Sequence, residues 1–288
     1  MMGMTAPPLH ILSGFQVGHA TPVELDDAWA GGWRCDRAVL RWTDDPARAT
    51  WTAKTLDRVR PAGVAVARPI RSSDGRWSVG GWNARTFLSG ARAPRFDETA
   101  ATVLRVNEAL RDEERPAFLT APEPGRTWSE RDILAAAEHA AWSPDPAAVV
   151  GAVLDPDSVP RDDVAQAIEK VVGLVLLRDE VTAPDQLVHA DALGTTAYDG
   201  AADPVVTDIV PAWRPAGWSV AVLIVDSLAW ANAEDTLLNR WSHLPDFPQL
   251  VLRAVIYRLF VHVLHPGSRP EAWPGLARVS DVVAARFR

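Results

Sequence analysis

The stretch LVHADALGTTAYDG, residues 187–200, carries the most informative pattern of this chain. Its apolar start leads into His189-x-Asp191, a turn, and the first strand of a hairpin that we expect over residues 196–208. A hairpin folds back on itself, so the two ends of the segment come together. Asp191, just before the first strand, and Asp208, at the end of the second, are therefore expected to lie at the same end of the hairpin.

Two carboxylates at one end of a hairpin can divide the labour of a reaction. One can accept a proton from a hydroxyl group, and the other can hold Mg²⁺ on a phosphate. Aspartates are also common in turns, where the carboxylate caps backbone N–H groups. The pair alone therefore leaves both interpretations open, and the order of the surrounding elements has to be considered.

The first third of the chain has the pattern of short strands and turns with one helix. Strands are expected at 21–25, 33–35, 38–42, 64–69, 77–79 and 81–88, and the helix at 46–58. The segments 64–69 and 77–79 are expected to pair as a hairpin. After Ser89-Gly90 the pattern changes to helices with apolar faces. These helices are expected at 97–111, 129–141, 162–178, 218–230 and 248–264.

This order of elements resembles the protein-kinase-like fold, and within it the aminoglycoside phosphotransferase-type branch. There the loop reads His-Gly-Asp-Leu-x-x-x-Asn, and the metal-binding strand reads Val-Ile-Asp. The chain is most similar to an actinobacterial family whose metal Asp is followed by Trp-Arg-Pro, here residues 213–215. The resemblance covers nearly the whole chain. It implies an α+β, two-lobed fold with a small β-rich N-lobe over 1–88 and a larger, mainly helical C-lobe over 89–288.

The resemblance also implies roles for individual residues. Asp191 would be the catalytic-loop base that orients a substrate hydroxyl, and Asp208 would bind Mg²⁺. His189 would pack the catalytic loop. Asp226 lies in an apolar helical run, where a carboxylate needs hydrogen-bond partners. By resemblance, the backbone amides of the catalytic loop would donate to it. ATP and Mg²⁺ are the implied ligands.

Three positions depart from what phosphoryl transfer requires. Arg41 stands where the ATP-binding Lys is expected, and its planar guanidinium is not an equivalent replacement. Lys54 stands where a Glu should pair with that Lys, and two like charges cannot form the pair. Thr195 or Thr196 replaces the metal-binding Asn. An alternative is that Lys54 reaches the phosphates from its helix while Arg41 plays another part.

Three functions follow as hypotheses. The first is a kinase-fold protein, a pseudokinase, whose ATP site is degraded and whose phosphoryl transfer is weak or absent. It would act by binding a nucleotide, a small molecule or a protein partner. The second is an active phosphotransferase for small molecules that depends on ATP and Mg²⁺, with Asp191 as base and Asp208 as metal ligand. The third is a structural interaction module that has kept only the fold.

Composition narrows the setting in which these functions would operate. The 288 residues are 48% hydrophobic and 23% charged, as in ordinary globular proteins. A net charge of −8 disfavours a nucleic-acid partner. The lone cysteine, Cys35, excludes an internal disulfide and favours a reducing compartment. With no signal-peptide pattern and a longest apolar run of only 220–225, we expect a cytoplasmic protein without a membrane partner.

Overall fold

The computed structural model describes residues 5–119, 130–151 and 160–287. Its contacts divide the chain into two compact units. Unit 1 comprises residues 1–118 and 187–211, and unit 2 comprises 119–186 and 212–288. The predicted lobe boundary after residue 88 stays a prediction, because these units group the chain by contacts and assign residues 187–211 to the β-rich part.

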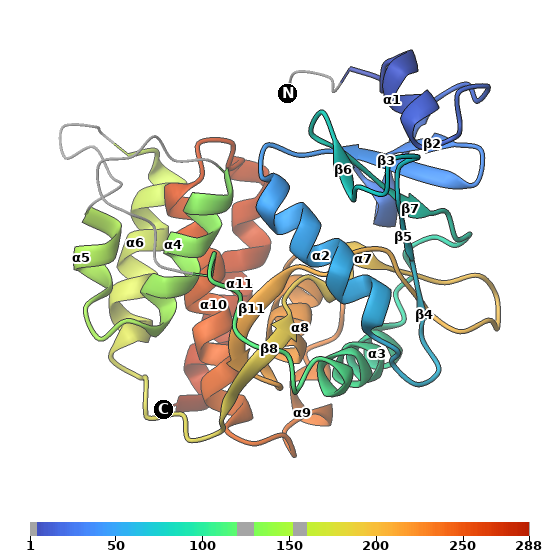
Figure 1. Ribbon diagram of the computed structural model, residues 1–288. Helices are drawn as coiled ribbons and strands as arrows, with labels where there is room; N and C mark the ends of the chain where they lie inside the picture. Colours follow the sequence, from blue (N-terminus) through green and yellow to red (C-terminus); the bar gives the residue numbers. More distant parts are fainter. Residues whose placement is uncertain (1–4, 120–129, 152–159, 288) are drawn as a thin grey trace. The chain divides into compact units, whose positions relative to one another are not determined.

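Unit 1 holds most of the strands (Figure 1). Its helices are α1 (Leu9–Gly14), η1 (Asp27–Trp29), α2 (Pro46–Arg58), α3 (Phe96–Ala109) and α7 (Ala192–Thr195). Its strands are β1 (Val23–Glu24), β2 (Trp33–Cys35), β3 (Ala38–Trp42), β4 (Ala65–Val66), β5 (Pro69–Ile70), β6 (Ser78–Val79), β7 (Trp82–Thr86), β9 (Thr196–Ala197) and β10 (Val205–Val206). Strands β8 (Asp185–His189) and β11 (Pro211–Pro215) each cross the division between the units. The Trp-Arg-Pro element lies in β11.

The main sheet of unit 1 has the order β1-β2-β3-β7-β5, with β6 also paired to β7, and every pairing is antiparallel. In the β3–β7 register, Arg41 lies opposite Asn83 and Val39 lies opposite Arg85. Side chains alternate along a strand and directly paired residues share a face. These four side chains therefore lie on one face of the sheet.

One buried cluster of unit 1 packs on the other face of this sheet. Helix α1, which the sequence reading did not predict, contributes the buried side chains of Ile11 and Phe15. They pack in one cluster with Leu40 and Trp82 of β3 and β7. Because Leu40 and Trp82 occupy this buried face, the alternating residues of β3 and β7, including Arg41 and Arg85, lie on the opposite face.

A second, smaller sheet contains the hairpin that follows Asp191. Its order is β4-β10-β9, and β10 pairs antiparallel with β9, with Val206 opposite Thr196. The hairpin expected over 196–208 is confirmed, with shorter strands. Strand β10 also pairs in parallel with β4, so segment 64–69 is divided between two sheets. The expected hairpin of 64–69 with 77–79 is wrong, because β5 and β6 each pair with β7 instead.

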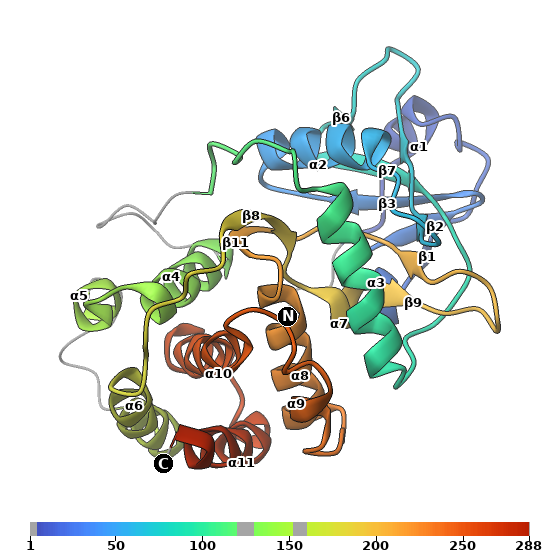
Figure 2. The same ribbon diagram turned by 90° about the horizontal axis from the view of Figure 1, so that it is seen from below.

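Unit 2 is mainly helical, with α10 (Phe247–Leu264) packed against four other helices (Figure 2). Those four are α4 (Glu130–Trp142), α6 (Asp162–Val175), α8 (Trp218–Trp230) and α11 (Trp273–Ala284). Short elements complete the unit: α5 (Pro146–Gly151), α9 (Leu237–Arg240), η2 (Pro270–Ala272) and η3 (Ala285–Phe287). The predicted helices correspond to α3, α4, α6, α8 and α10, whereas α11 was not predicted. Residue 129, the predicted start of α4, lies outside the described residues.

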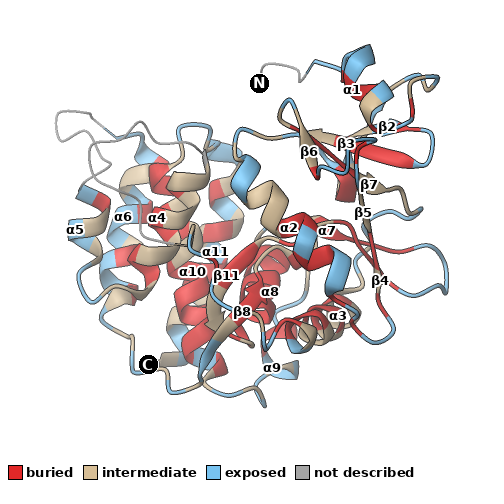
Figure 3. Cartoon of the chain, viewed as in Figure 1, coloured by how far each residue is buried: buried red, intermediate tan, exposed pale blue. Residues whose placement is uncertain are grey.

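Helix α10 is the one described helix that is long and apolar enough to cross a membrane, with a mean hydropathy of 1.4 over 18 residues. However, 78% of it is buried inside the protein. Figure 3 shows α8 and α10 coloured as buried along most of their length. The apolar composition of α10 is therefore accounted for by its place in the core of unit 2.

Candidate functional site

The catalytic-loop candidate is held by a chain of hydrogen bonds through His189. The backbone N–H of Val210 donates to Nδ1 of His189 at 3.0 Å, so Nδ1 carries no proton and Nε2 does. Nε2 then donates to the Thr195 hydroxyl at 2.7 Å, which in turn donates to the backbone carbonyl of Asp191 at 2.5 Å. The ring thus ties both sides of the hairpin to the loop.

Burial keeps this imidazole neutral. The His189 side chain is fully buried, and this burial lowers its pKa below the ordinary value, although the nearby carboxylates of Asp191 and Asp208 act in the opposite direction. The backbone N–H of His189 donates to Oδ1 of Asn107 at 2.9 Å. Both ring nitrogens and the backbone N–H of His189 are thereby engaged in holding the loop, so the side chain has no free nitrogen for proton transfer.

Asp191 caps the short helix α7. Its Oδ1 accepts from the backbone N–H of Gly194 at 3.0 Å. A Cβ at position 194 would lie 2.6 Å from the carboxylate oxygens, so the glycine is what lets the carboxylate fold over the turn. Asp191 remains partly exposed. The turn-capping interpretation therefore describes its observed contacts, and its role as a catalytic base stays a prediction.

Asp208 lies between two arginines, an arrangement that we call the Arg41–Asp208–Arg85 cluster. Nη1 of Arg41 is 3.0 Å from Oδ2 of Asp208, and Nη1 of Arg85 is 2.7 Å from Oδ1. The backbone N–H of Ile209 also donates to Oδ1, at 2.7 Å. The exposed fraction of the side chain is 16% for Asp208, 12% for Arg85 and 35% for Arg41. Each carboxylate oxygen therefore has its own guanidinium partner.

The two arginines keep Asp208 ionised against the effect of burial. Burial alone would raise the pKa of Asp208, but Arg85 and then Arg41 outweigh it, and the pKa is lowered. Burial lowers the pKa of Arg41, and its neighbour Arg85 adds to that effect, while Asp208 and Asp191 oppose it. Buried ions of one sign need partners of the other. The ionisation of each member of the cluster therefore depends on the others, and removing one member leaves a buried charge without its partner.

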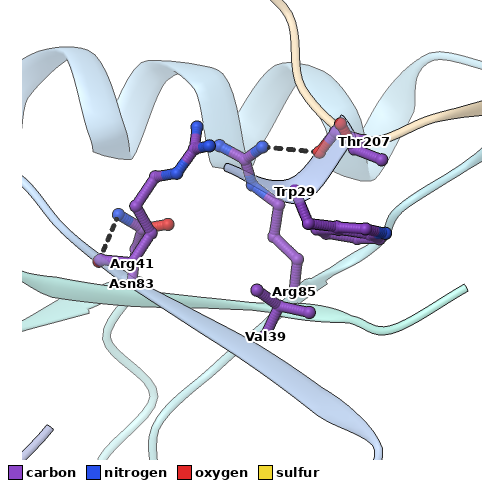
Figure 4. Close-up of a pocket in the computed structure, with 6 residues that line it drawn as sticks. All are labelled: Trp29, Val39, Arg41, Asn83, Arg85 and Thr207. Carbon is purple, nitrogen blue, oxygen red and sulfur yellow. Dashed lines mark hydrogen bonds between the residues drawn. The ribbon is translucent and has the colours of Figure 1, made fainter. Parts of the chain in front are cut away.

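Each arginine is also anchored to the backbone. Nη2 of Arg41 donates to the carbonyl of Ala30, and Nη1 of Arg85 donates to the carbonyl of Thr207 at 2.7 Å. The side-chain amide of Asn83 donates to the carbonyl of Arg41 at 3.1 Å, across the paired strands. Figure 4 shows both guanidinium groups directed to the same side of the sheet, next to one another.

These side chains nearly fill the space between them. The cavity lined by Trp29, Val39, Arg41, Asn83, Arg85 and Thr207 has a volume of about 10 Å³ (Figure 4). That is roughly the room for one water molecule, whereas a pocket for a cofactor-sized ligand typically has at least about 300 Å³. The space among these six side chains is therefore too small for a cofactor-sized ligand.

Magnesium does not fit it either. Hard cations need several oxygen ligands, and both oxygens of Asp208 already contact a guanidinium. The hydroxyl of Thr195 is engaged with His189 and Asp191, and Thr196 is buried in β9. Among the described residues, no three His, Cys, Asp or Glu side chains lie where they could hold a metal ion. A role of Thr195 or Thr196 in place of the metal-binding Asn stays a prediction, and the observed contacts of Thr195 do not favour it.

Two further predicted residues lie away from the cluster. Lys54 is exposed on α2, and no contact of the described residues joins it to Arg41, Asp208 or Arg85. Asp226, buried in α8, accepts from Nε of Arg258 in α10 at 2.6 Å, and Nη2 of Arg258 contacts its other oxygen. Asp226 thus has a structural ion pair within unit 2, and the predicted bonds from the catalytic loop stay a prediction.

Arg85 is the site residue that sequence reasoning missed. It lies in the segment 81–88, which was expected to be a strand, and nothing in that segment matches a motif. The signal lies in the pairing: once β3 is placed against β7, Arg85 falls opposite Val39 and on the same face as Arg41. That register could not be read from either strand alone.

Comparison with known proteins places the fold. No family model matches the sequence, and no curated protein matches it. Among solved structures, a microcompartment-associated aminopropanol kinase is similar, with a TM-score of 0.57 and 15% identity over 97% of this chain and 95% of that one.

Two further solved structures agree. A thermostable mutant of aminoglycoside phosphotransferase APH(4)-Ia, in complex with AMP-PNP and hygromycin B, has a TM-score of 0.52 and 16% identity over 96% of this chain and 97% of that one. A choline/ethanolamine kinase family protein from Mesorhizobium loti has a TM-score of 0.51 and 16% identity over 96% and 94%. At these identities the likeness is one of fold, and it extends over nearly the full length of each chain.

Proposed function

We propose that this chain, which has the kinase-like fold of the aminoglycoside phosphotransferases, acts by binding a small molecule or a protein partner and transfers phosphoryl groups weakly or not at all. The fold is that of phosphotransferases. The proposal concerns what has become of the site that such a fold uses for ATP and Mg²⁺.

One observation carries the proposal. Both oxygens of Asp208 are bound by arginines, and the space beside them is about 10 Å³. Phosphoryl transfer depends almost entirely on positioning and on neutralising charge at the phosphates. In this chain the groups for both tasks are engaged with one another. Losing several such contacts at about 2–4 kcal/mol each would slow the chemical step by many powers of ten.

The test is a thermal-shift titration of the wild type with ATP, with Mg²⁺ in one series and EDTA in the other. A ligand at one hundred times its Kd stabilises the folded state by about 2.7 kcal/mol, or roughly 5 °C in Tm. We expect no shift that depends on Mg²⁺ at millimolar ATP. A Mg²⁺-dependent shift in the wild type that disappears in Asp208→Ala would contradict the proposal.

A second candidate function has its own support. Asp191 is partly exposed, and the loop that carries it is fully hydrogen-bonded through His189. An active phosphotransferase would keep such a loop, with ATP and Mg²⁺ binding after the arginines leave Asp208. The same titration decides between the two functions, because the active enzyme requires the Mg²⁺-dependent shift. For either function we propose a cytoplasmic location, supported by the single buried cysteine, Cys35.

A further inference from the structure

Two guanidinium groups converge on one carboxylate in the Arg41–Asp208–Arg85 cluster. They come from neighbouring strands of one sheet, and they meet the two oxygens of Asp208 at 3.0 and 2.7 Å. Each oxygen of the Asp208 carboxylate therefore contacts a different arginine. Guanidinium groups suit both carboxylate and phosphate oxygens, since both anions present adjacent oxygens to planar N–H donors.

The walls of the cluster strengthen these contacts. Trp29 and Val39 are buried apolar neighbours of the two arginines. Ion pairs between apolar walls are less screened than pairs in water. The backbone anchors at Ala30 and Thr207 hold the guanidiniums in place independently of Asp208. The two arginines therefore have supports that remain if the carboxylate is removed.

The local charge would change sign if Asp208 were lost. Arg41 and Arg85 face Asp208, and Asp191 also acts on Arg41. With all four groups ionised, the charges balance. Without Asp208, the group has one net positive charge, two anchored guanidiniums, and the space that the carboxylate filled.

We propose that Arg41 and Arg85 form a metal-independent binding site for a phosphate-type oxyanion, and that Asp208 occupies this site as an internal competitor. The inference rests on the proposed function, since it treats Asp208 as a partner of the arginines and not as a metal ligand. A ligand phosphate binds by displacing the carboxylate. The partly exposed Arg41 is the side from which it enters.

The test uses Asp208→Ala in EDTA, with inorganic phosphate as the probe and calorimetry as the measurement. A metal site loses its ligand when the carboxylate is removed, whereas this site gains affinity. We expect phosphate to bind Asp208→Ala at least about tenfold more tightly than it binds the wild type. Asp208→Asn is the matched control, because it removes the charge but leaves the volume filled. Its gain should be smaller.

A second substitution identifies the arginine. Adding Arg85→Gln to Asp208→Ala should abolish the gain, because one of the two guanidiniums is lost. ATP without metal, and adenosine, distinguish the sources of the phosphate. Binding of phosphate alone points to a free oxyanion or a small phosphorylated ligand. Binding of ATP but not of phosphate or adenosine points to the phosphates of a nucleotide, and both results support the site.

Two results would overturn the inference: no gain in Asp208→Ala, or a gain that survives Arg85→Gln. If Asp208→Ala does not fold, wild type and Arg85→Gln are compared in phosphate and in chloride at equal ionic strength. Equal thermal shifts for the two proteins then overturn it. If the wild type does not bind ATP with Mg²⁺ and the variants also fail to bind phosphate, this inference alone is refuted. Mg²⁺-dependent ATP binding refutes the proposed function.

Discussion

At the scale of single residues, Thr195 and Thr196 have different surroundings although they are neighbours in the sequence. The hydroxyl of Thr195 links the His189 ring to the carbonyl of Asp191. Thr196 is also buried, in β9, and its hydroxyl makes no hydrogen bond among those of the described residues. Either threonine matched the expected position of a metal-binding amide, and the structure gives one of them a different task.

Replacing Thr195 by Val removes this link and keeps the shape of the side chain. The buried Nε2–H of His189 then loses its acceptor, which costs about 1–3 kcal/mol of unfolding free energy. Thr196→Val is the matched control and should show no loss of that size. Urea denaturation of both variants measures the difference. Equal midpoints for the two variants would show that the Thr195 hydroxyl does not hold the loop.

At the scale of elements, two helical glycines of unit 2 differ in how much space surrounds them. Gly275 in α11 lies against α8, where a Cβ would come within 2.0 Å of the carbonyl oxygen of Ala229. Gly173, in the last turn of α6, is exposed, and a Cβ there would meet nothing within 4 Å. The first glycine is required by close packing, and the second only weakens its helix.

Substitution by alanine should therefore act in opposite directions at these two sites. Gly275→Ala forces α11 away from α8 and should cost about 1–3 kcal/mol or more, as overpacking does. Gly173→Ala should stabilise the protein by about 0.5–1 kcal/mol, through better helix propensity and a less flexible unfolded chain. Thermal melts of both variants give the two signs. A stable Gly275→Ala variant would refute the close approach of the two helices.

The elements also indicate how far the sequence could be read. Helix α2 was predicted with its observed bounds, because it begins at Pro46 and no internal glycine or proline interrupts it. The structure adds a cap by the Asp45 side chain. Local signals of this kind suffice for a helix or a hairpin. They did not reveal α1 or α11, nor the parallel pairing of β10 with β4, which joins segments far apart in the chain. Arg85 was missed for the same reason, since its partner Asp208 is distant in sequence.

At the scale of the whole molecule, the two units contain buried groups with different responses to acid. In unit 1, burial lowers the pKa of His189, whereas in the unfolded chain it titrates near 6.5. In unit 2, hydrogen bonds from Arg161, at 3.0 and 3.1 Å, lower the pKa of Asp163 to about 2, although burial opposes them, and a bond to His262 at 2.8 Å also lowers it.

Unit 1 should therefore lose stability first as the pH falls. Below about pH 6.5 the unfolded chain binds a proton at His189 that the folded chain excludes, so unfolding becomes easier. The contribution of Asp163 is present above its unfolded pKa of about 4 and is lost only as the pH falls towards 2.

Hydrogen exchange at pH 7 and 5 measures this order, after correction for the intrinsic exchange rate. Amides of β3 and β7 should lose protection at pH 5, while those of α6 and α10 keep theirs. Earlier loss in α6 and α10 would mean that other groups dominate the acid response.

The parallel pairing of β4 with β10 has a consequence for synthesis on the ribosome. Residues 65–66 emerge early, but the strand that pairs with them, residues 205–206, is translated much later. At about 5–20 residues per second, the chain from 118 to 211 takes roughly 5 to 20 s to appear. Throughout that time the nascent chain exposes the edge of β4 and carries two arginines without their aspartate. The segment that completes unit 1 arrives only after the first segment of unit 2, residues 119–186, has been made.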